Sequence, residues 1–344
     1  MTAASMSLIS YSPTGLDTPK RARVEAGENR FKRFSKALFN YVHTFLDPRE
    51  LAELLPTCKR LYKSAGDIYL MSSREVRSVE DVLGWLKFSN ESLRVPRNYT
   101  QVVDLMKNLR FLKLNGKGLF SARAQREQVR QILASKVVSQ LTELHVSSGL
   151  SNATAYDIAT RCSELNTLHL NWCFDLTDEG TTRLTRLTKL HTASFYGSPR
   201  VSTKTAERLA KMPSLTGVNL MGCLGMTHEA VSALLDAPSL RSLELGGING
   251  DHDYQEQQRI AGVIAEKGGN LTHLVTLHTQ YEPARFIQIA SGCQQLIQLD
   301  MRAFDLPTAS QRASLRSAME EQNPRLTILG LCPPADAESD SDEF

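Results

Sequence analysis

The stretch LNTLHLNWC, which begins at Leu165, decides the fold because variants of it recur through most of the chain. Its closest copies are LTGVNLMGC from Leu215 and LRSLELGGI from Leu240. More divergent copies are LRFLKLNGK from Leu109, LTELHVSSG from Leu141, LHTASFYGS from Leu190, LTHLVTLHT from Leu271, LIQLDMRAF from Leu296 and LTILGLC from Leu326. Consecutive copies begin 24 to 32 residues apart. One short structural unit is therefore repeated about nine times.

Each copy has the form L-x-x-L-x-L, which predicts a strand. Neighbouring side chains on a strand point to opposite faces, so the first, fourth and sixth positions enter a core and those between them point outward. One copy cannot cover its own apolar face, so the copies must stack. Around residue 271 the register stays open, because a copy beginning at Leu274 fits as well as one beginning at Leu271.

A period in the twenties with this form resembles leucine-rich repeats, in which one strand and one helix make each turn of a solenoid. The resemblance implies an α/β fold, a curved parallel sheet with outer helices, over residues 109–332. Cys162 to Gly180, CSELNTLHLNWCFDLTDEG, resembles the cysteine-containing subclass, C-x-x-L-x-x-L-x-L-x-x-C-x-x-L/I-T-D-x-G, at every fixed position. Such a fold provides an extended binding surface and not an active site.

Three short helices are predicted before the repeats. Leu38, Val42 and Phe45 lie on one face of the first, and Asp47-Pro48 is a helix start, with an N-cap followed by Pro at the first helical position. The segments RELAELL and CKRLYKSA are expected to form the second and third helices. One reading is that these helices only cap the end of the solenoid, whose terminal repeat would otherwise expose its core.

The segment from Phe34 to Lys63 also resembles an F-box, a module that in its family docks onto a Skp-type adaptor and through it onto a cullin ubiquitin ligase. Two departures from that family are Phe34-Ser35 in place of Leu-Pro and Leu61 in place of Trp. The resemblance implies adaptor contacts from Leu38, Val42, Leu46, Pro48, Leu51, Leu54 and Cys58.

The predicted organisation is therefore a disordered basic arm (1–30), an F-box-like module (31–65), a helical linker and cap (66–108), the solenoid (109–332) and a disordered acidic tail (333–344). In the arm, Lys20, Arg21 and Arg23 form either a nuclear import signal or a solvated basic tail. No secretion signal is recognised at the start of the sequence, so we expect a cytoplasmic or nuclear protein, or one present in both.

Composition narrows the class of function. The 344 residues are 41% apolar and carry a net charge of +3, too little to indicate nucleic acid or a membrane as the main partner. Six cysteines without a C-x-x-C pair predict reduced, buried thiols. His145 and His169 share an outward position, where a solvated face is expected rather than a metal pair. No phosphate loop or catalytic motif is present, so we expect no enzyme activity, no metal and no cofactor.

These observations favour a substrate-recognition subunit of a Skp-cullin-F-box ubiquitin ligase, with a Skp-type adaptor, a cullin and a target protein as partners. The alternative is a leucine-rich-repeat scaffold or inhibitor that never meets a ligase. One predicted row of target-binding positions, running from basic to acidic, consists of Lys113, His145, His169, Ser194, Asn219 and Glu244, and the same position holds Val275 and Asp300 in the next two copies.

Just beyond that row, Trp172, Tyr196 and Met221 are predicted to form the binding hot spot, because large apolar groups placed after a strand suit a protein interface. The alternative is that Trp172 folds back over the core near Cys173.

Overall fold

The computed structural model describes residues 75–76, 98–115, 122–148, 150–247, 254–302, 304, 306 and 308–331. The chain divides into two compact units, residues 1–62 and 63–344, and all described residues belong to the second. The predicted basic arm, the F-box-like module with its candidate adaptor contacts, and the acidic tail lie outside the described residues.

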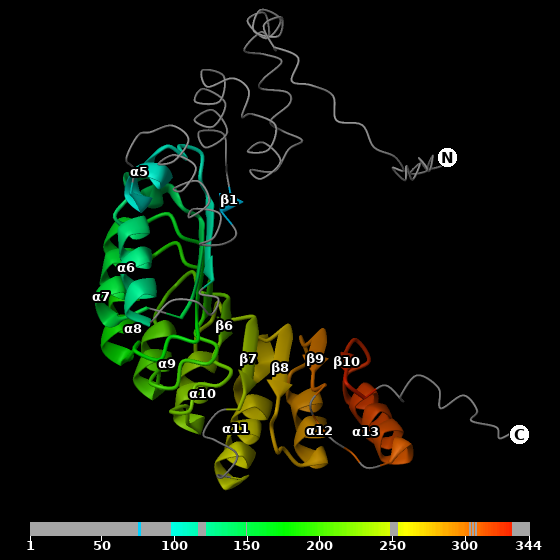
Figure 1. Ribbon diagram of the computed structural model, residues 1–344. Coiled ribbons are helices and arrows are strands. Elements are labelled where there is room, and N and C mark those ends of the chain that lie inside the picture. The colour runs from blue at the N-terminus through cyan, green and yellow to red at the C-terminus, as the bar shows by residue number, and fades with distance from the viewer. Residues whose placement is uncertain are drawn as a thin grey trace, which may run out of the picture. The chain divides into compact units, whose positions relative to one another are not determined.

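The described strands form one parallel sheet in which the order in space is the order in sequence (Figure 1). The strands are β1 (Glu75–Val76), β2 (Phe111–Asn115), β3 (Glu143–Ser147), β4 (Thr167–Asn171), β5 (Thr192–Ser194), β6 (Gly217–Asn219), β7 (Ser242–Gly246), β8 (His273–Leu277), β9 (Gln298–Asp300) and β10 (Thr327–Leu329). Each of the nine sequence copies contributes one strand, as predicted, so the fold is a leucine-rich-repeat solenoid.

Helices alternate with the strands and cover one side of the sheet (Figure 1). They are α5 (Tyr99–Asp104), α6 (Ala122–Leu133), α7 (Asn152–Arg161), α8 (Asp178–Leu184), α9 (Thr203–Leu209), α10 (His228–Leu235), α11 (Tyr254–Lys267), α12 (Pro283–Gly292) and α13 (Ala309–Gln322), with 3-10 turns η2 (Lys136–Gln140) and η3 (Gly268–Asn270). None of the described helices is long and apolar enough to cross a membrane.

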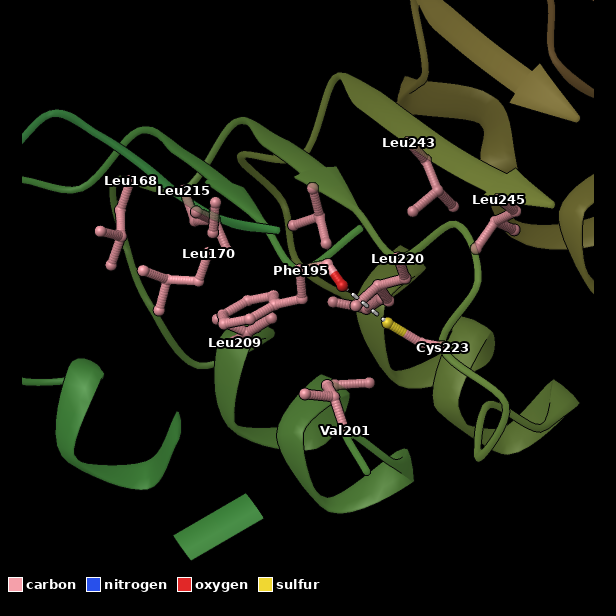
Figure 2. Packing of buried hydrophobic residues seen from close by; sticks show 14 of the residues in the cluster. Leu168, Leu170, Phe195, Val201, Leu209, Leu215, Leu220, Cys223, Leu243 and Leu245 are labelled. Atoms are coloured by element: carbon pink, nitrogen blue, oxygen red, sulfur yellow. Dashed lines mark hydrogen bonds between the residues drawn. The ribbon is translucent and has the colours of Figure 1, made fainter. Parts of the chain in front are cut away.

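The core lies between the sheet and the helices. Figure 2 shows Leu168 and Leu170 of β4 beside Phe195, with Leu220 and Leu245 of the following repeats. Each of these side chains is 0 or 1% exposed, and full burial of one such side chain stabilises the fold by about 1.5–3 kcal/mol. The helices and neighbouring repeats supply this burial, so the stacked copies are stable where a single copy would not be.

The cysteines of the described repeats are free and buried, as predicted, and they are Cys162, Cys173, Cys223 and Cys293. Burial raises the pKa of each thiol to about 12. The Cys223 thiol donates to the Phe195 carbonyl oxygen at 3.2 Å, across one repeat (Figure 2). Such thiols are packing groups, because a nucleophilic or metal-binding cysteine needs the thiolate form.

The pairing settles two registers. Leu274 lies opposite Leu243 and Leu299, and Thr276 is buried, so the copy begins at Leu271. The last copy differs by one residue from the prediction, because Ile328, not Leu329, lies opposite Leu299 and enters the core. The Leu326 N–H still donates to the Asn323 carbonyl at 3.0 Å, as the Leu296 N–H does to that of Cys293 at the same distance. The last copy therefore has one residue fewer between its first leucine and its strand.

Within residues 66–108, the structure describes one helix, α5, whose N-cap Asn98 accepts from the Gln101 N–H at 2.9 Å. Glu75–Val76 forms β1 and pairs with Phe111 and Leu112 of β2. The additional strand has a physical reason, since an unpaired edge leaves a row of N–H and C=O groups exposed.

Polar side chains tie the helix N-termini of adjacent repeats together. Asn152 Oδ1 accepts from the Thr177 N–H at 3.0 Å, and Asp178 Oδ1 accepts from the Ser202 N–H at 2.9 Å. Burial acts to raise the pKa of Asp178, but hydrogen bonds from Ser202 and Thr205 outweigh it and lower that pKa. A Cβ at Gly180 would lie 2.5 Å from Asn152 Oδ1, so the repeat's T-D-x-G segment needs glycine for close packing.

Candidate functional site

The face of the sheet opposite the helices carries the predicted row of outward positions. Strand pairing places its eight residues side by side in one line from β2 to β9: Lys113, His145, His169, Ser194, Asn219, Glu244, Val275 and Asp300. Ser194 and Asp300 are only 4% exposed, so neighbouring side chains cover part of the row. The geometry of the row follows the sequence period, and its role in target binding stays a prediction.

A groove of about 390 Å³ lies on this open face across β4 to β7. We call it the sheet groove, and its lining residues are His169, Asn171, Thr192, Ser194, Tyr196, Gly217, Val218, Asn219, Met221, Ser242 and Glu244. It brings together six predicted site residues: His169, Ser194, Tyr196, Asn219, Met221 and Glu244. The other predicted site residues, Lys113, His145 and Trp172, are not among its lining residues.

Other lining residues were missed in the sequence. Thr192, Gly217 and Ser242 occupy the third position of their copies and lie side by side in the sheet. A Cβ at Gly217 would lie 3.5 Å from Thr192 Oγ1, an ordinary contact, so glycine is not required there to avoid a clash. Its missing side chain instead deepens the groove. The sequence could have indicated these residues, because the third position of a copy points to the same outward side of the strand as the fifth.

Hydrogen bonds within the sheet groove use several of its donors. The Ser194 hydroxyl donates to Asn171 Oδ1 at 2.8 Å, and the Asn219 side-chain amide donates to Glu244 Oε2. Asn219 Oδ1 accepts from the Met221 N–H at 3.0 Å, which fixes the orientation of the Asn219 amide. These contacts order the polar floor across β4 to β7.

At one end of the sheet groove, the His169 ring stacks on that of His145, with centroids 4.1 Å apart and planes 9° apart. Burial, with positive charge at His145 and Lys113, lowers the pKa of His169 to about 4, and burial and Lys113 also lower the pKa of His145. His145 Nε2 lies 2.8 Å from Glu143 Oε1, though not aligned for a hydrogen bond. The pair is therefore neutral at neutral pH and partly buried on the open face.

At the other end lies Glu244, whose pKa is raised by burial and by the negative charge of Asp300. Asp300 itself is paired, because Arg302 Nε lies 3.0 Å from its Oδ1 and a terminal guanidinium nitrogen lies 2.7 Å from its Oδ2. Within the described ranges, no lysine, arginine or histidine forms an ion pair with Glu244. Glu244 is therefore an acidic side chain of the sheet groove that has no cationic partner among the described residues.

In the six copies whose eighth position the structure describes, that residue has left-handed backbone, with φ between 53° and 71°. These residues are Ser148, Trp172, Gly197, Gly222, Gly247 and His278. Three are glycine, the residue that adopts this conformation without penalty. Trp172, at φ 58°, is a large side chain held there at a cost of about 1–2 kcal/mol. Strain of this kind concentrates at functional sites.

Trp172 lies beside the sheet groove in a cluster that we call the apolar ridge, formed by Trp172, Phe174 and Tyr196. The Trp172 and Tyr196 rings meet edge to face at 4.9 Å, and those of Trp172 and Phe174 are 6.4 Å apart. A Cβ at Gly197 would lie 2.5 Å from the Trp172 ring, so the indole rests directly on that backbone.

The apolar ridge is open to solvent, because Trp172 is 46% and Phe174 58% exposed. Cys173 enters the core instead, so the alternative that Trp172 folds back over the core is wrong. Phe174 was missed in the sequence, as was Leu224, which occupies the same repeat position two copies later and is 50% exposed. Exposed aromatic groups gathered in this way are typical of protein interfaces.

One group of described side chains has donor atoms close enough for a metal ion. Atoms of His228, Glu229 and Glu256 lie within 4.8 Å of one another. Glu256 Oε1 accepts from the His228 N–H at 2.6 Å and lies 2.8 Å from its ring nitrogen, and Arg259 approaches Oε2 at 3.4 Å. These contacts give the group a structural role as the cap of helix α10.

Comparisons with known proteins do not place the chain in a family. No protein-family model and no curated protein matches the sequence. Among solved structures it is similar to TLR13 in a complex with ssRNA13 (18% identity, TM-score 0.42), covering 66% of this chain but only 29% of that one. A second match, to an internalin from Listeria monocytogenes, has 13% identity and a TM-score of 0.36. It covers 76% of this chain and 82% of the internalin. The chain is also similar to Rad7 in the yeast Rad7–Elc1 complex, with 17% identity and a TM-score of 0.38. That match covers 77% of this chain and 72% of Rad7. Likenesses this distant say nothing about function.

Proposed function

We propose that the chain is the substrate-recognition subunit of a Skp-cullin-F-box ubiquitin ligase and binds its target protein on the open face of the sheet. The observation that carries target binding is the exposed apolar ridge beside the sheet groove. Buried aromatic anchors surrounded by polar groups dominate the binding free energy of protein interfaces. The described residues offer this combination along the strands β4 to β7 and in the segments that follow β4 and β5.

The ligase link rests on the sequence between Phe34 and Lys63, which resembles an F-box. In this arrangement the chain performs no chemistry. It raises the effective concentration of the target near a charged conjugating enzyme, so that transfer becomes nearly intramolecular. Phe34-Ser35 and Leu61, which depart from the F-box pattern, favour the second candidate function, a scaffold or inhibitor that uses the same open face without an adaptor.

Co-purification tests the ligase link. The wild-type chain should capture a Skp-type adaptor and a cullin, and Leu46→Asp with Leu51→Asp should abolish capture. A charge desolvated at an interface without a partner costs several kcal/mol, so the loss should exceed about a hundredfold in affinity.

The melting temperature of the repeats should stay unchanged in that double variant. Glu207→Gln, on the exposed side of helix α9, is the matched control and should capture the adaptor normally. A folded wild-type chain that never captures the adaptor would rule out the ligase and leave the scaffold.

A further inference from the structure

Glu244 is the feature of the sheet groove that the fold leaves unexplained. It is partly buried, accepts one hydrogen bond from Asn219 and has no cationic partner among the described residues. A carboxylate removed from water without a counter-charge lowers stability. The open side of the groove leaves room for that charge to come from a ligand.

The hydrogen bonds of the sheet groove favour a ligand rich in donors. The Ser194 hydroxyl hydrogen is directed to Asn171, and an Asn219 amide hydrogen is directed to Glu244. The Glu244 carboxylate retains unused lone pairs, so it can accept further hydrogen bonds from a ligand. A group with several N–H donors fits this pattern better than another acceptor does.

The remaining walls suit a cation on an apolar stem. Tyr196 and Met221 line one side and offer an aromatic face and a thioether. His169, at the opposite end, is uncharged at neutral pH and does not repel a cation. Lys113 lies two strands away from His169, on β2, and is not a lining residue.

We infer that the sheet groove takes an arginine side chain of the target protein, with its guanidinium group against Glu244 and its stem along Tyr196 and Met221. Arginine fits better than lysine because its planar fork carries five donors and stacks on aromatic rings. The inference rests on the proposed function only in placing the target on the open face, and it is independent of the ligase link.

Fluorescein-labelled octapeptide pools test the inference with the full-length chain. The pools contain only uncharged residues except for one fixed central Arg, Lys, Gln or Glu. Fluorescence polarisation should show the Arg pool binding about tenfold or more tightly than the Gln pool, because a hydrogen bond to a charged group contributes that much. Glu244→Gln should remove the difference, and Glu207→Gln, an equal change of charge on helix α9, should preserve it.

A second measurement needs no change at Glu244. The Met221 methyl NMR signal, identified by its loss in Met221→Leu, should shift with N-acetyl-arginine methylamide and not with N-acetyl-norleucine methylamide. Equal binding of the Arg and Gln pools, preference for Glu, or an Arg preference that survives Glu244→Gln would overturn the inference. Failure to capture the adaptor would overturn only the ligase link.

Discussion

The two faces of the same strands follow different rules. On the buried face, neighbouring strands present Leu144, Leu168, Ala193, Val218 and Leu243, all apolar and at most 2% exposed. On the open face, the adjacent row changes from Lys113 through two histidines to Glu244. Stacking requires the first face to repeat and leaves the second free to vary. The repeated residues therefore specify the fold, and the departures from repetition mark the candidate site.

The largest expected effect comes from comparing alanine substitutions at two neighbouring residues of β4 whose side chains point to opposite faces of the sheet. Leu170→Ala should lower the free energy of unfolding by about 3 kcal/mol, because it leaves a cavity in a fully buried core. His169→Ala, one residue earlier on the open face, should lower it by less than about 1 kcal/mol. Urea denaturation of both variants measures the difference. Equal losses would break the distinction between the two faces.

Lowering the pH should reduce the stability of the fold through His169 on the open face. The pKa of His169 falls from 6.5 to about 4 on folding, so the unfolded chain takes up the proton first. With respect to this group, stability is therefore constant above pH 6.5 and falls as the pH decreases from 6.5 towards 4, by about 1.5 kcal/mol after allowance for solvent screening.

Urea midpoints between pH 7 and 4 should therefore decrease, and His169→Gln should flatten the decrease. The effect of Asp178 can be separated from that of His169. Because the pKa of Asp178 is lowered, the stability that its carboxylate contributes is lost only below pH 3.8, its ordinary pKa. A profile that is identical in wild type and His169→Gln would contradict the neutral stack.

The smallest effect separates strain from packing at Trp172. Glycine holds the same left-handed position in three of the following repeats, so Trp172→Gly should be more stable than Trp172→Ala by roughly 0.5–1 kcal/mol. Thermal unfolding of the two variants measures this difference. An alanine variant as stable as the glycine variant would show that the backbone relaxes when the indole is removed.

The fold was largely predictable because apolar positions repeat. The strands and the outward row follow from the period and from side-chain alternation. The one-residue shift before Ile328 could not be predicted. Leu326, Leu329 and Leu331 also fit the pattern, and only pairing with β9 decides between the registers. Local sequence cannot resolve such a choice.

The candidate site was predictable only in part. Six lining residues of the sheet groove were found in the sequence, four from the outward row and two, Tyr196 and Met221, from the predicted hot spot. Gly217 was not found, because a hollow depends on what two adjacent strands present together. The left-handed position had a visible signal in Gly197, Gly222 and Gly247, spaced 25 residues apart. This signal did not extend to Trp172, because tryptophan occupies a position where glycine is expected.

Target binding by the open face is the central claim, and one matched pair of variants tests it most directly. Trp172→Ala with Tyr196→Ala removes the apolar ridge, and Tyr156→Ala removes an equally exposed aromatic residue, 46% like Trp172, from helix α7. Affinity for a purified target, identified by capture on the wild-type chain, is measured for both variants. The ridge variant should lose about 2 kcal/mol, nearly thirtyfold in Kd, with little change in melting temperature, and Tyr156→Ala should bind as wild type does. Unchanged binding by a folded ridge variant would contradict the account.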